Sequence, residues 1–231
     1  MKIFAFSDWR VQDVSQVYSI LDTLYRDIDF IIYAGDDINR FHDRGINHFS
    51  ELAKKTKQKK VLAVIGNDDM HEVKEVLNVE GVHDLHNKPF IYENYAFIGL
   101  EGSTKGPGLV KYTERQVKKH LQNHYQKVKG KKIVVVSHTP PHGVLDMGIR
   151  FGVSHIGSTS LRDFILKNNP KMVVCGHCHS HGGLSENLKN CKVFNVSSHD
   201  SPGSTGNMAI IELGDELEVN GNILRICLPI L

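Results

Sequence analysis

The chain has 231 residues, of which 40% are hydrophobic, and its formal net charge is +2. This size suits one sizeable core, and a charge so near zero gives no compositional indication of a nucleic-acid or membrane partner. The apolar start KIFAF meets Ser7 and Asp8 too early for a signal peptide, and no apolar run approaches the roughly 20 residues of a spanning helix. Four scattered cysteines do not form a disulfide framework, so we expect a reducing, cytoplasmic location.

The first half of the chain alternates strand and helix patterns. Short apolar runs predict strands at 2–7, 30–35 and 61–66. Apolar residues at helical spacing predict two intervening helices, one through Val14, Val17, Leu21, Leu24 and Ile28 and one through Ile46, Phe49 and Ala53. This βαβαβ order predicts parallel strands joined by right-handed crossovers.

The middle of the chain predicts a hairpin and a capped helix. Residues 89–102 form two strand-like runs around Glu93-Asn94. Thr113 and Gln116 make a capping box that begins an amphipathic helix, which ends before Gly130.

The second half adds strands and one more helix. We expect strands at 132–138, 171–177, 192–197 and 208–213. A helix capped by Ser160 and Asp163 should stop at Asn169-Pro170, and Asn220-Gly221 predicts the turn of a final hairpin. With no repeat and no linker pattern, residues 1–231 are predicted to form a single domain.

Residues that can bind metals follow the buried strands. They are Asp8, Asp36, Asn67, His138, His177 and His179. Ligands of α/β sheets gather at the carboxyl ends of the strands, so these side chains can converge although they are far apart in sequence. Six protein ligands exceed a single catalytic zinc site and suit two metals that share a carboxylate. Mixed nitrogen and oxygen ligands suit manganese, iron, zinc or nickel.

The same residues resemble the calcineurin-like metallophosphoesterase family. The resemblance spans residues 8–179 and rests on SDWR at 7–10, GDD at 35–37, GNDD at 66–69, SHTPP at 137–141 and GHCH at 176–179. It implies an α/β fold, the four-layer α/β/β/α sandwich of two mixed sheets. It also implies one or two divalent metal ions, with manganese favoured.

The resemblance further implies a role for each ligand. Asp8, Asp36 and His179 would hold the first metal, Asp36 would bridge, and Asn67, His138 and His177 would complete the second. The implied reaction is attack of metal-bound hydroxide on a phosphate ester, at a dinuclear site or one weakened to mononuclear.

Two positions depart from the family pattern. Arg10 stands where the first motif usually has a histidine, and a guanidinium has no lone pair for a metal. We therefore expect a weak or empty first site, or an arginine that grips the substrate phosphate. Asp68 stands where many members have the histidine that protonates the leaving group. Its absence is shared with diesterase-like branches, so a phosphodiester substrate is favoured over a monoester.

Several other residues have more than one interpretation. Cys175, Cys178, His177 and His179 could form a zinc knuckle or a redox pair, but both interpretations leave the distant carboxylates unexplained. His142, His155, His181 and His199 are predicted to be solvated loop histidines. His155 is the best substrate-binding candidate among them, because it leads into a helix N-terminus that can hold an anion.

Lysine-rich stretches at 54–60 and 118–132 predict solvated helix faces, so a nucleic-acid substrate is not favoured. The alternative to an enzyme is a catalytically impaired scaffold with the same fold, and Arg10 and Asp68 favour it. Against it, all six ligand positions keep ligand-type residues. The predicted pocket loops are 39–48, 101–110 and 139–157. Oligomeric state and the individual substrate have no sequence signal.

Overall fold

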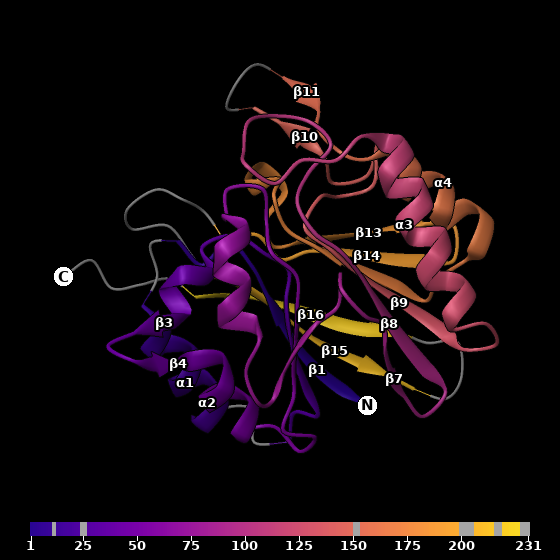
Figure 1. The fold of residues 1–231 in the computed structure, drawn as a ribbon. Coiled ribbons are helices and arrows are strands. Elements are labelled where there is room, and N and C mark those ends of the chain that lie inside the picture. Colours follow the sequence, from indigo (N-terminus) through magenta and orange to yellow (C-terminus); the bar gives the residue numbers. More distant parts are fainter. Residues whose placement is uncertain (11–12, 24–26, 150–152, 199–205, 215–218, 227–231) are drawn as a thin grey trace.

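The computed structural model describes residues 1–10, 13–23, 27–149, 153–198, 206–214 and 219–226. Two six-stranded sheets pack face to face, and helices cover the outer face of each (Figure 1). This arrangement confirms the predicted four-layer α/β/β/α sandwich. Within the ranges just given, no helix is both long enough and apolar enough to span a bilayer.

The first sheet carries the predicted βαβαβ strands. Its order is β16 (Val219–Ile226), β15 (Gly206–Leu213), β1 (Lys2–Phe6), β2 (Phe30–Tyr33), β5 (Val61–Ala63) and β6 (Val82–Asp84). Strands β1, β2 and β5 are parallel, as predicted. Strand β6, which the sequence patterns did not predict, pairs parallel with β5, and β15 and β16 are antiparallel additions at the other side.

The second sheet has a parallel centre between antiparallel edges. Its order is β13 (Leu184–Leu188), β14 (Cys191–Asn195), β12 (Met172–Cys175), β9 (Lys132–Ser137), β8 (Tyr95–Leu100) and β7 (Phe90–Tyr92). The predicted hairpin around Glu93-Asn94 is β7–β8. The edge strand β13 has little apolar character, and the sequence patterns did not predict it.

The strands are apolar on both faces because each sheet is covered on both sides. Along β1, Ile3 and Ala5 point into the layer between the sheets, whereas Phe4 and Phe6 point under the helices. Continuous apolar runs are typical of parallel strands buried in this way. The carboxyl ends of the strands are therefore the places where polar side chains can emerge.

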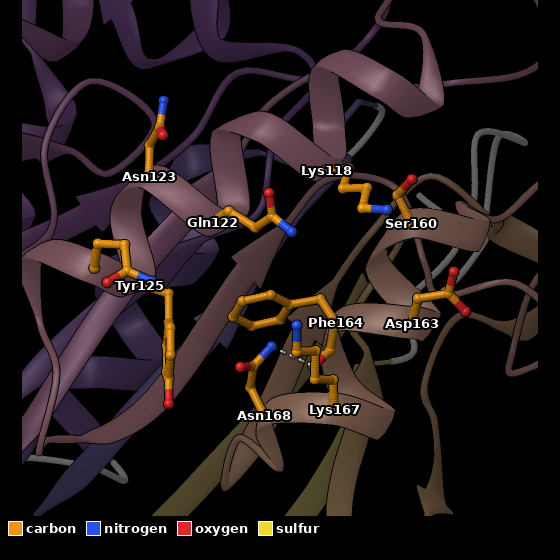
Figure 2. Close-up of a pocket in the computed structure, with 10 residues that line it drawn as sticks. Lys118, Gln122, Asn123, Tyr125, Ser160, Asp163, Phe164, Lys167 and Asn168 are labelled. Carbon is orange, nitrogen blue, oxygen red and sulfur yellow. Dashed lines mark hydrogen bonds between the residues drawn. The ribbon is translucent and has the colours of Figure 1, made fainter.

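Helices α1 (Val14–Thr23) and α2 (His48–Lys54) cover the first sheet, and α3 (Glu114–Lys127) and α4 (Thr159–Asn168) cover the second. Short 3₁₀ segments are η1 (Ile38–Phe41), η2 (His71–Leu77) and η3 (His179–His181). A polar groove lies between α3 and α4, with Tyr125 and Phe164 among its lining residues (Figure 2). None of the predicted metal ligands lines that groove.

One predicted helix start is confirmed and another is wrong. Thr113 and Gln116 form the expected capping box of α3. Helix α4 is capped by Ser158, whose hydroxyl accepts a hydrogen bond from the Leu161 amide at 3.1 Å, and not by Ser160 or Asp163. Both Ser158 and Ser160 are small hydroxyl residues of the kind preferred at a helix start, and the helix begins two residues earlier than predicted.

The predicted turn at Asn220-Gly221 is also wrong. Strand β16 runs through both residues, with Asn220 paired to Glu212 and Gly221 to Ile211 of β15. A β-carbon on Gly221 would lie 2.5 Å from the ring of Phe194. The glycine therefore marks the close approach of an aromatic ring to a strand rather than a turn.

Two of the three predicted pocket loops contain small elements of their own. Residues 39–48 include β3 (His42–Asp43) and β4 (Ile46–Asn47), and residues 139–157 include β10 (Met147–Gly148) and β11 (Ser154–His155). In the remaining loop, residues 101–110, the carbonyl of Pro107 accepts a hydrogen bond from the side chain of Asn67, so this loop borders a predicted ligand. The β10–β11 hairpin projects from the body of the sandwich at the top of Figure 1.

Candidate metal centre

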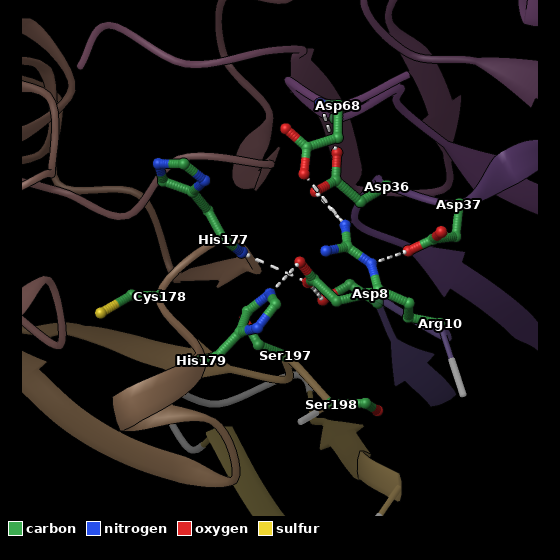
Figure 3. Close-up of polar contacts among 12 residues, drawn as sticks. Asp8, Arg10, Asp36, Asp37, Asp68, His177, Cys178, His179, Ser197 and Ser198 are labelled. Carbon is green, nitrogen blue, oxygen red and sulfur yellow. Dashed lines mark hydrogen bonds and ion pairs between the residues drawn. The ribbon is translucent and has the colours of Figure 1, made fainter. Parts of the chain in front are cut away.

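All six predicted ligands come together at the carboxyl ends of the strands. Ligand atoms of Asp8, Asp36 and His138 lie within 4.8 Å of one another. Nε2 of His138 is 2.9 Å from Oδ1 of Asn67, and Nε2 of His179 is 3.0 Å from Oδ1 of Asp8. The rings of His138 and His177 are 5.1 Å apart between centroids. Figure 3 shows the part of this cluster built on Asp8, Asp36 and the two C-terminal histidines.

Three of these side chains belong to residues with an unusual backbone conformation. Asp8, Asp36 and His177 have φ values of 52°, 62° and 65°, in the left-handed region that non-glycine residues seldom adopt. Each turn comes directly after or close behind a buried strand, so the chain reverses where the side chain must face the centre. Backbone strain of this kind tends to cluster at functional sites.

His138 presents a lone pair to two oxygens that cannot donate to it. Its Nδ1 lies 2.8 Å from the carbonyl of Ala34 and must carry the ring proton, which leaves Nε2 as an acceptor in the neutral ring. Nε2 faces Oδ1 of Asn67 and, at 3.5 Å, Oδ1 of Asp36. The Asn67 amide is oriented by its Nδ2, which donates to Asp68 and Pro107. Three acceptors that face one another fit a cation.

His177 adds a fourth acceptor to this half of the centre. Its Nε2 is buried and has no hydrogen-bond partner. Burial lowers the pKa of this imidazole to about 3, so the ring is neutral and its lone pair is available at neutral pH. A buried ring nitrogen without a partner is the state expected of a metal ligand.

Asp8 and His179 form a pair on the other side of the centre. Oδ2 of Asp8 accepts hydrogen bonds from the Ser7 hydroxyl at 2.6 Å and the His177 amide at 3.2 Å. Burial raises the pKa of Asp8, but the hydrogen bond and charge of His179 outweigh it and hold the pKa well below its usual value. Oδ1 faces His179 and is the oxygen available to a metal.

Asp36 lies between the two halves and is almost fully buried. Burial and the charge of Asp8 raise its pKa well above the usual value. Its two oxygens point in different directions: Oδ1 faces His138 and accepts from the Asp68 amide at 2.9 Å, and Oδ2 is 3.4 Å from Nη2 of Arg10. A cation on the Oδ1 side would relieve the cost of burying this carboxylate.

The guanidinium of Arg10 occupies the side of Asp36 opposite to His138. Its Nε donates to Asp37 at 2.8 Å, and its Nη2 donates to Asp68 at 3.0 Å (Figure 3). Burial lowers its pKa, but the three carboxylates raise it further still, so the group stays cationic. A fixed positive charge therefore sits where the family pattern has a neutral ligand.

Some residues of the centre had no clear sequence signal. Ser7 supports Asp8, and the hydroxyl of Tyr33, a strand residue, donates to the carbonyl of Asp36. Asp37 holds Arg10, and the carboxylate of Asp69 accepts from the amides of Ile38 and Gly66 at 3.1 and 2.8 Å.

The structure does not support the argument that made His155 a substrate-binding candidate. The N-terminus of α4 is already filled by a carboxylate, because Glu114 accepts hydrogen bonds from the amides of Thr159 and Ser160 at 3.1 and 2.8 Å. His155 itself is directed to Asp146, with 2.7 Å between its Nδ1 and Oδ1. His199 lies outside the described residues.

The cysteines next to the histidines are structural. Sγ of Cys175 is buried and directed to the carbonyl of Phe194 at 3.4 Å, and burial raises the pKa of both Cys175 and Cys178. A thiol with a raised pKa is a poor metal ligand and a poor redox nucleophile. The zinc-knuckle and redox interpretations are therefore not supported by the environment of these two residues.

Comparisons with known proteins agree with the fold. A family model described as calcineurin-like phosphoesterase matches residues 1–181. The uncharacterized protein MJ1162 of Methanocaldococcus jannaschii is 32% identical over 165 residues, which cover 67% of this chain and 72% of that protein.

Among solved structures, TT1561 of Thermus thermophilus has a TM-score of 0.61 at 14% identity, covering 96% of this chain and 97% of that one. The phosphopantetheinyl hydrolase PptH of Mycobacterium tuberculosis has a TM-score of 0.54 at 16% identity, covering 85% and 88%. At these identities the two structures show a shared fold.

Proposed function

Because this chain belongs to the calcineurin-like phosphoesterase family, we propose that it is a metal-dependent phosphoric ester hydrolase that prefers a phosphodiester to a monoester. The observation that carries the proposal is the cluster of buried ligand-type atoms on Asp36, Asn67 and His138, beside which the buried Nε2 of His177 has no hydrogen-bond partner. A scaffold would not need to keep such an arrangement, because burying unpaired polar atoms is costly.

These four residues would hold the tightly bound divalent ion. A divalent ion there would polarise a phosphoryl oxygen and make a water acidic enough to react near neutral pH. Asp8 and His179, together with Oδ2 of Asp36, remain for a second ion, which would take the position of the first metal in the family pattern. Mixed nitrogen and oxygen ligands admit manganese, iron, zinc and nickel, and we favour manganese.

We propose that Arg10 replaces the charge of this second ion. Its Nη2 already lies 3.4 Å from Oδ2 of Asp36, on the same side of the centre. A cation at this place repels a second cation, so the chain would bind one ion tightly. The guanidinium would also be placed to stabilise the charge on a phosphate.

Asp68 would act by positioning rather than as the acid for the leaving group. One of its oxygens accepts from Nδ2 of Asn67 at 2.6 Å and the other from Nη2 of Arg10 at 3.0 Å. It thereby joins a metal ligand to the arginine. Without the histidine that many members carry here, we expect the enzyme to favour esters whose leaving group needs little protonation.

The first test of the function is Asp36→Asn. Asparagine tolerates the left-handed backbone and keeps the size of the side chain, so the fold should be retained. We expect hydrolysis of bis(p-nitrophenyl) phosphate in the presence of manganese to fall by more than about 100-fold, because a lost ligand should cost at least what a lost supporting residue costs. Asp163→Asn, an exposed change on α4, should leave turnover unaltered.

Two outcomes would contradict the proposal. Turnover that survives in Asp36→Asn would place the chemistry elsewhere. A wild-type chain that binds neither manganese, zinc nor iron and hydrolyses neither a diester nor a monoester would favour the protein-interaction scaffold. A faster reaction with p-nitrophenyl phosphate than with the diester would overturn only the preference for diesters.

A further inference from the structure

A second group of potential metal ligands lies outside the centre described above. It consists of His142, Asp146 and His155, whose ligand atoms all lie within 4.8 Å of one another. They belong to the segment that follows β9, with His155 on β11 and the other two before β10. The hydrogen bonds and ion pairs of the described residues do not join any of them to a ligand of the main centre.

The carboxylate of Asp146 is buried and held in one orientation. Its Oδ2 accepts hydrogen bonds from the backbone amides of Gly143 at 2.9 Å and Gly157 at 3.1 Å. A β-carbon on Gly157 would lie 2.8 Å from the same oxygen, so the chain approaches as closely as glycine allows. This leaves Oδ1, which faces Nδ1 of His155 at 2.7 Å.

His142 faces the same carboxylate without a hydrogen bond. Its Nδ1 is buried, has no hydrogen-bond partner, and lies 3.5 Å from Oδ2 of Asp146. The backbone fixes this position, because the His142 amide donates to Ser158 and its carbonyl accepts from Arg162, both at 2.9 Å. In an ordinary carboxylate–histidine pair, Nδ1 would form a hydrogen bond with the carboxylate. An ion bound between the three side chains explains why Nδ1 of His142 has no hydrogen-bond partner.

We propose that His142, Asp146 and His155 form a second divalent-cation site, separate from the hydrolytic centre. Two imidazole nitrogens and one carboxylate are the ligand types of zinc, and imidazole also suits nickel. Calcium and magnesium prefer sites made entirely of oxygen. The side chain of His155 is 46% exposed, so an ion can enter from solvent and keep a water as its fourth ligand.

An ion at this site would pin the β10–β11 hairpin to the body of the protein. It would join the chain at residues 142 and 146 to residue 155, on the far strand of the hairpin. The near strand is linked to η3, because the hydroxyl of Ser180 donates to the carbonyl of Met147. His179 begins η3, so the hairpin and the ligands of the main centre are connected through one short segment.

The test compares zinc binding in two variants that both lack the main bridging carboxylate. The cluster variant carries Asp36→Asn, His142→Ala and His155→Ala. The matched control carries Asp36→Asn and His42→Ala, which replaces an exposed histidine on β3. Bound zinc per chain is measured by elemental analysis after gel filtration, and affinity by calorimetry. We expect the control to retain one more zinc per chain than the cluster variant.

A conservative change protects the result against misfolding. Asp36→Asn with Asp146→Asn keeps an oxygen for the two glycine amides but loses the negative charge, so it should fold and still lose that zinc. Equal zinc contents in the control, the cluster variant and the Asp146→Asn variant would overturn the site. Because every chain in the comparison carries Asp36→Asn, the result does not depend on whether the main centre hydrolyses phosphate esters.

Discussion

At the scale of single residues, the proposal that Arg10 limits the main centre to one ion can be tested directly. Its guanidinium is fixed by Asp37 and Asp68 and lies against Asp36. Replacement by histidine, Arg10→His, would exchange a cation for a neutral ligand beside Asp8 and His179. We expect bound manganese to rise from one to two ions per chain, measured by elemental analysis. An unchanged count would mean that the arginine does not limit occupancy.

Gly66 matters because the carboxylate of Asp36 lies directly against its backbone. A β-carbon there would lie 1.9 Å from Oδ1 of Asp36 and 2.4 Å from the Asp36 amide nitrogen. Gly66→Ala should therefore displace Asp36 and abolish tight metal binding, which calorimetry with manganese would detect. Gly45→Ala, which meets nothing within 4 Å, is the control for a general effect of adding a methyl group. Wild-type affinity in Gly66→Ala would show that the ion does not need this position of Asp36.

At the scale of elements, the first turn of α3 caps the N-terminus of α4. Glu114 accepts from Ser158, Thr159 and Ser160, so one carboxylate satisfies amides of a helix that begins 45 residues later. Glu114→Ala should lower the free energy of unfolding by about 1–3 kcal/mol, the usual range for a lost cap or a charged hydrogen bond. Urea unfolding at neutral pH measures this.

The same contact has a defined pH dependence. Burial raises the pKa of Glu114, but the hydrogen bonds from α4 outweigh it, so the folded pKa is below its usual value of 4.5. The stabilisation is therefore present above about pH 4.5 and is lost as the pH falls through the folded pKa. The difference between wild type and Glu114→Ala should shrink in acid; a constant difference would assign the effect to packing alone.

At the scale of the whole molecule, a buried histidine stack makes stability sensitive to acid. His86 stacks on His120 with 3.9 Å between ring centroids, and His124 follows at 4.2 Å. Burial and the neighbouring histidines lower the pKa of His86 to about 2 and that of His124 to about 4. Burial also lowers the pKa of His120. Lys74 and the buried Glu101, which are paired at 2.6 Å, face the stack, and Glu101 is 3.6 Å from His86.

Between about pH 6.5 and pH 4, His86 and His124 are neutral in the folded chain and become protonated in the unfolded chain. The stack therefore contributes fully above about pH 6.5, and stability falls as the pH drops from there toward the folded pKa values. Each such group adds a slope of about 1.4 kcal/mol per pH unit. Urea unfolding from pH 7.5 to 5 should show this slope, and His124→Gln should make it shallower. A slope unchanged in His124→Gln would place the proton uptake elsewhere.

The sequence by itself determined the layers and which polar side chains meet at the ends of the strands. Apolar runs ended in a carboxylate, amide or imidazole at Asp8, Asp36, Asn67, His138 and His177, and parallel strands must bring such ends to one edge. The capping box of α3 was also predictable, because its two partners are three residues apart and interact locally. These features depend on the periodic spacing of apolar residues and on hydrogen bonds between residues close in sequence, so they can be recognised from the sequence.

Only the tertiary structure decided contacts between residues that are distant in sequence. Gly221 favours a turn by composition, but the ring of Phe194 requires a glycine there within a strand. The carboxylate of Glu114 accepts hydrogen bonds from Ser158 and from the N-terminus of α4. Because this N-terminus already binds an anionic group, the reason for predicting that His155 binds substrate no longer holds. Such contacts depend on how the two sheets and their helices pack against each other. The distances between residues in different elements cannot be predicted from local sequence patterns.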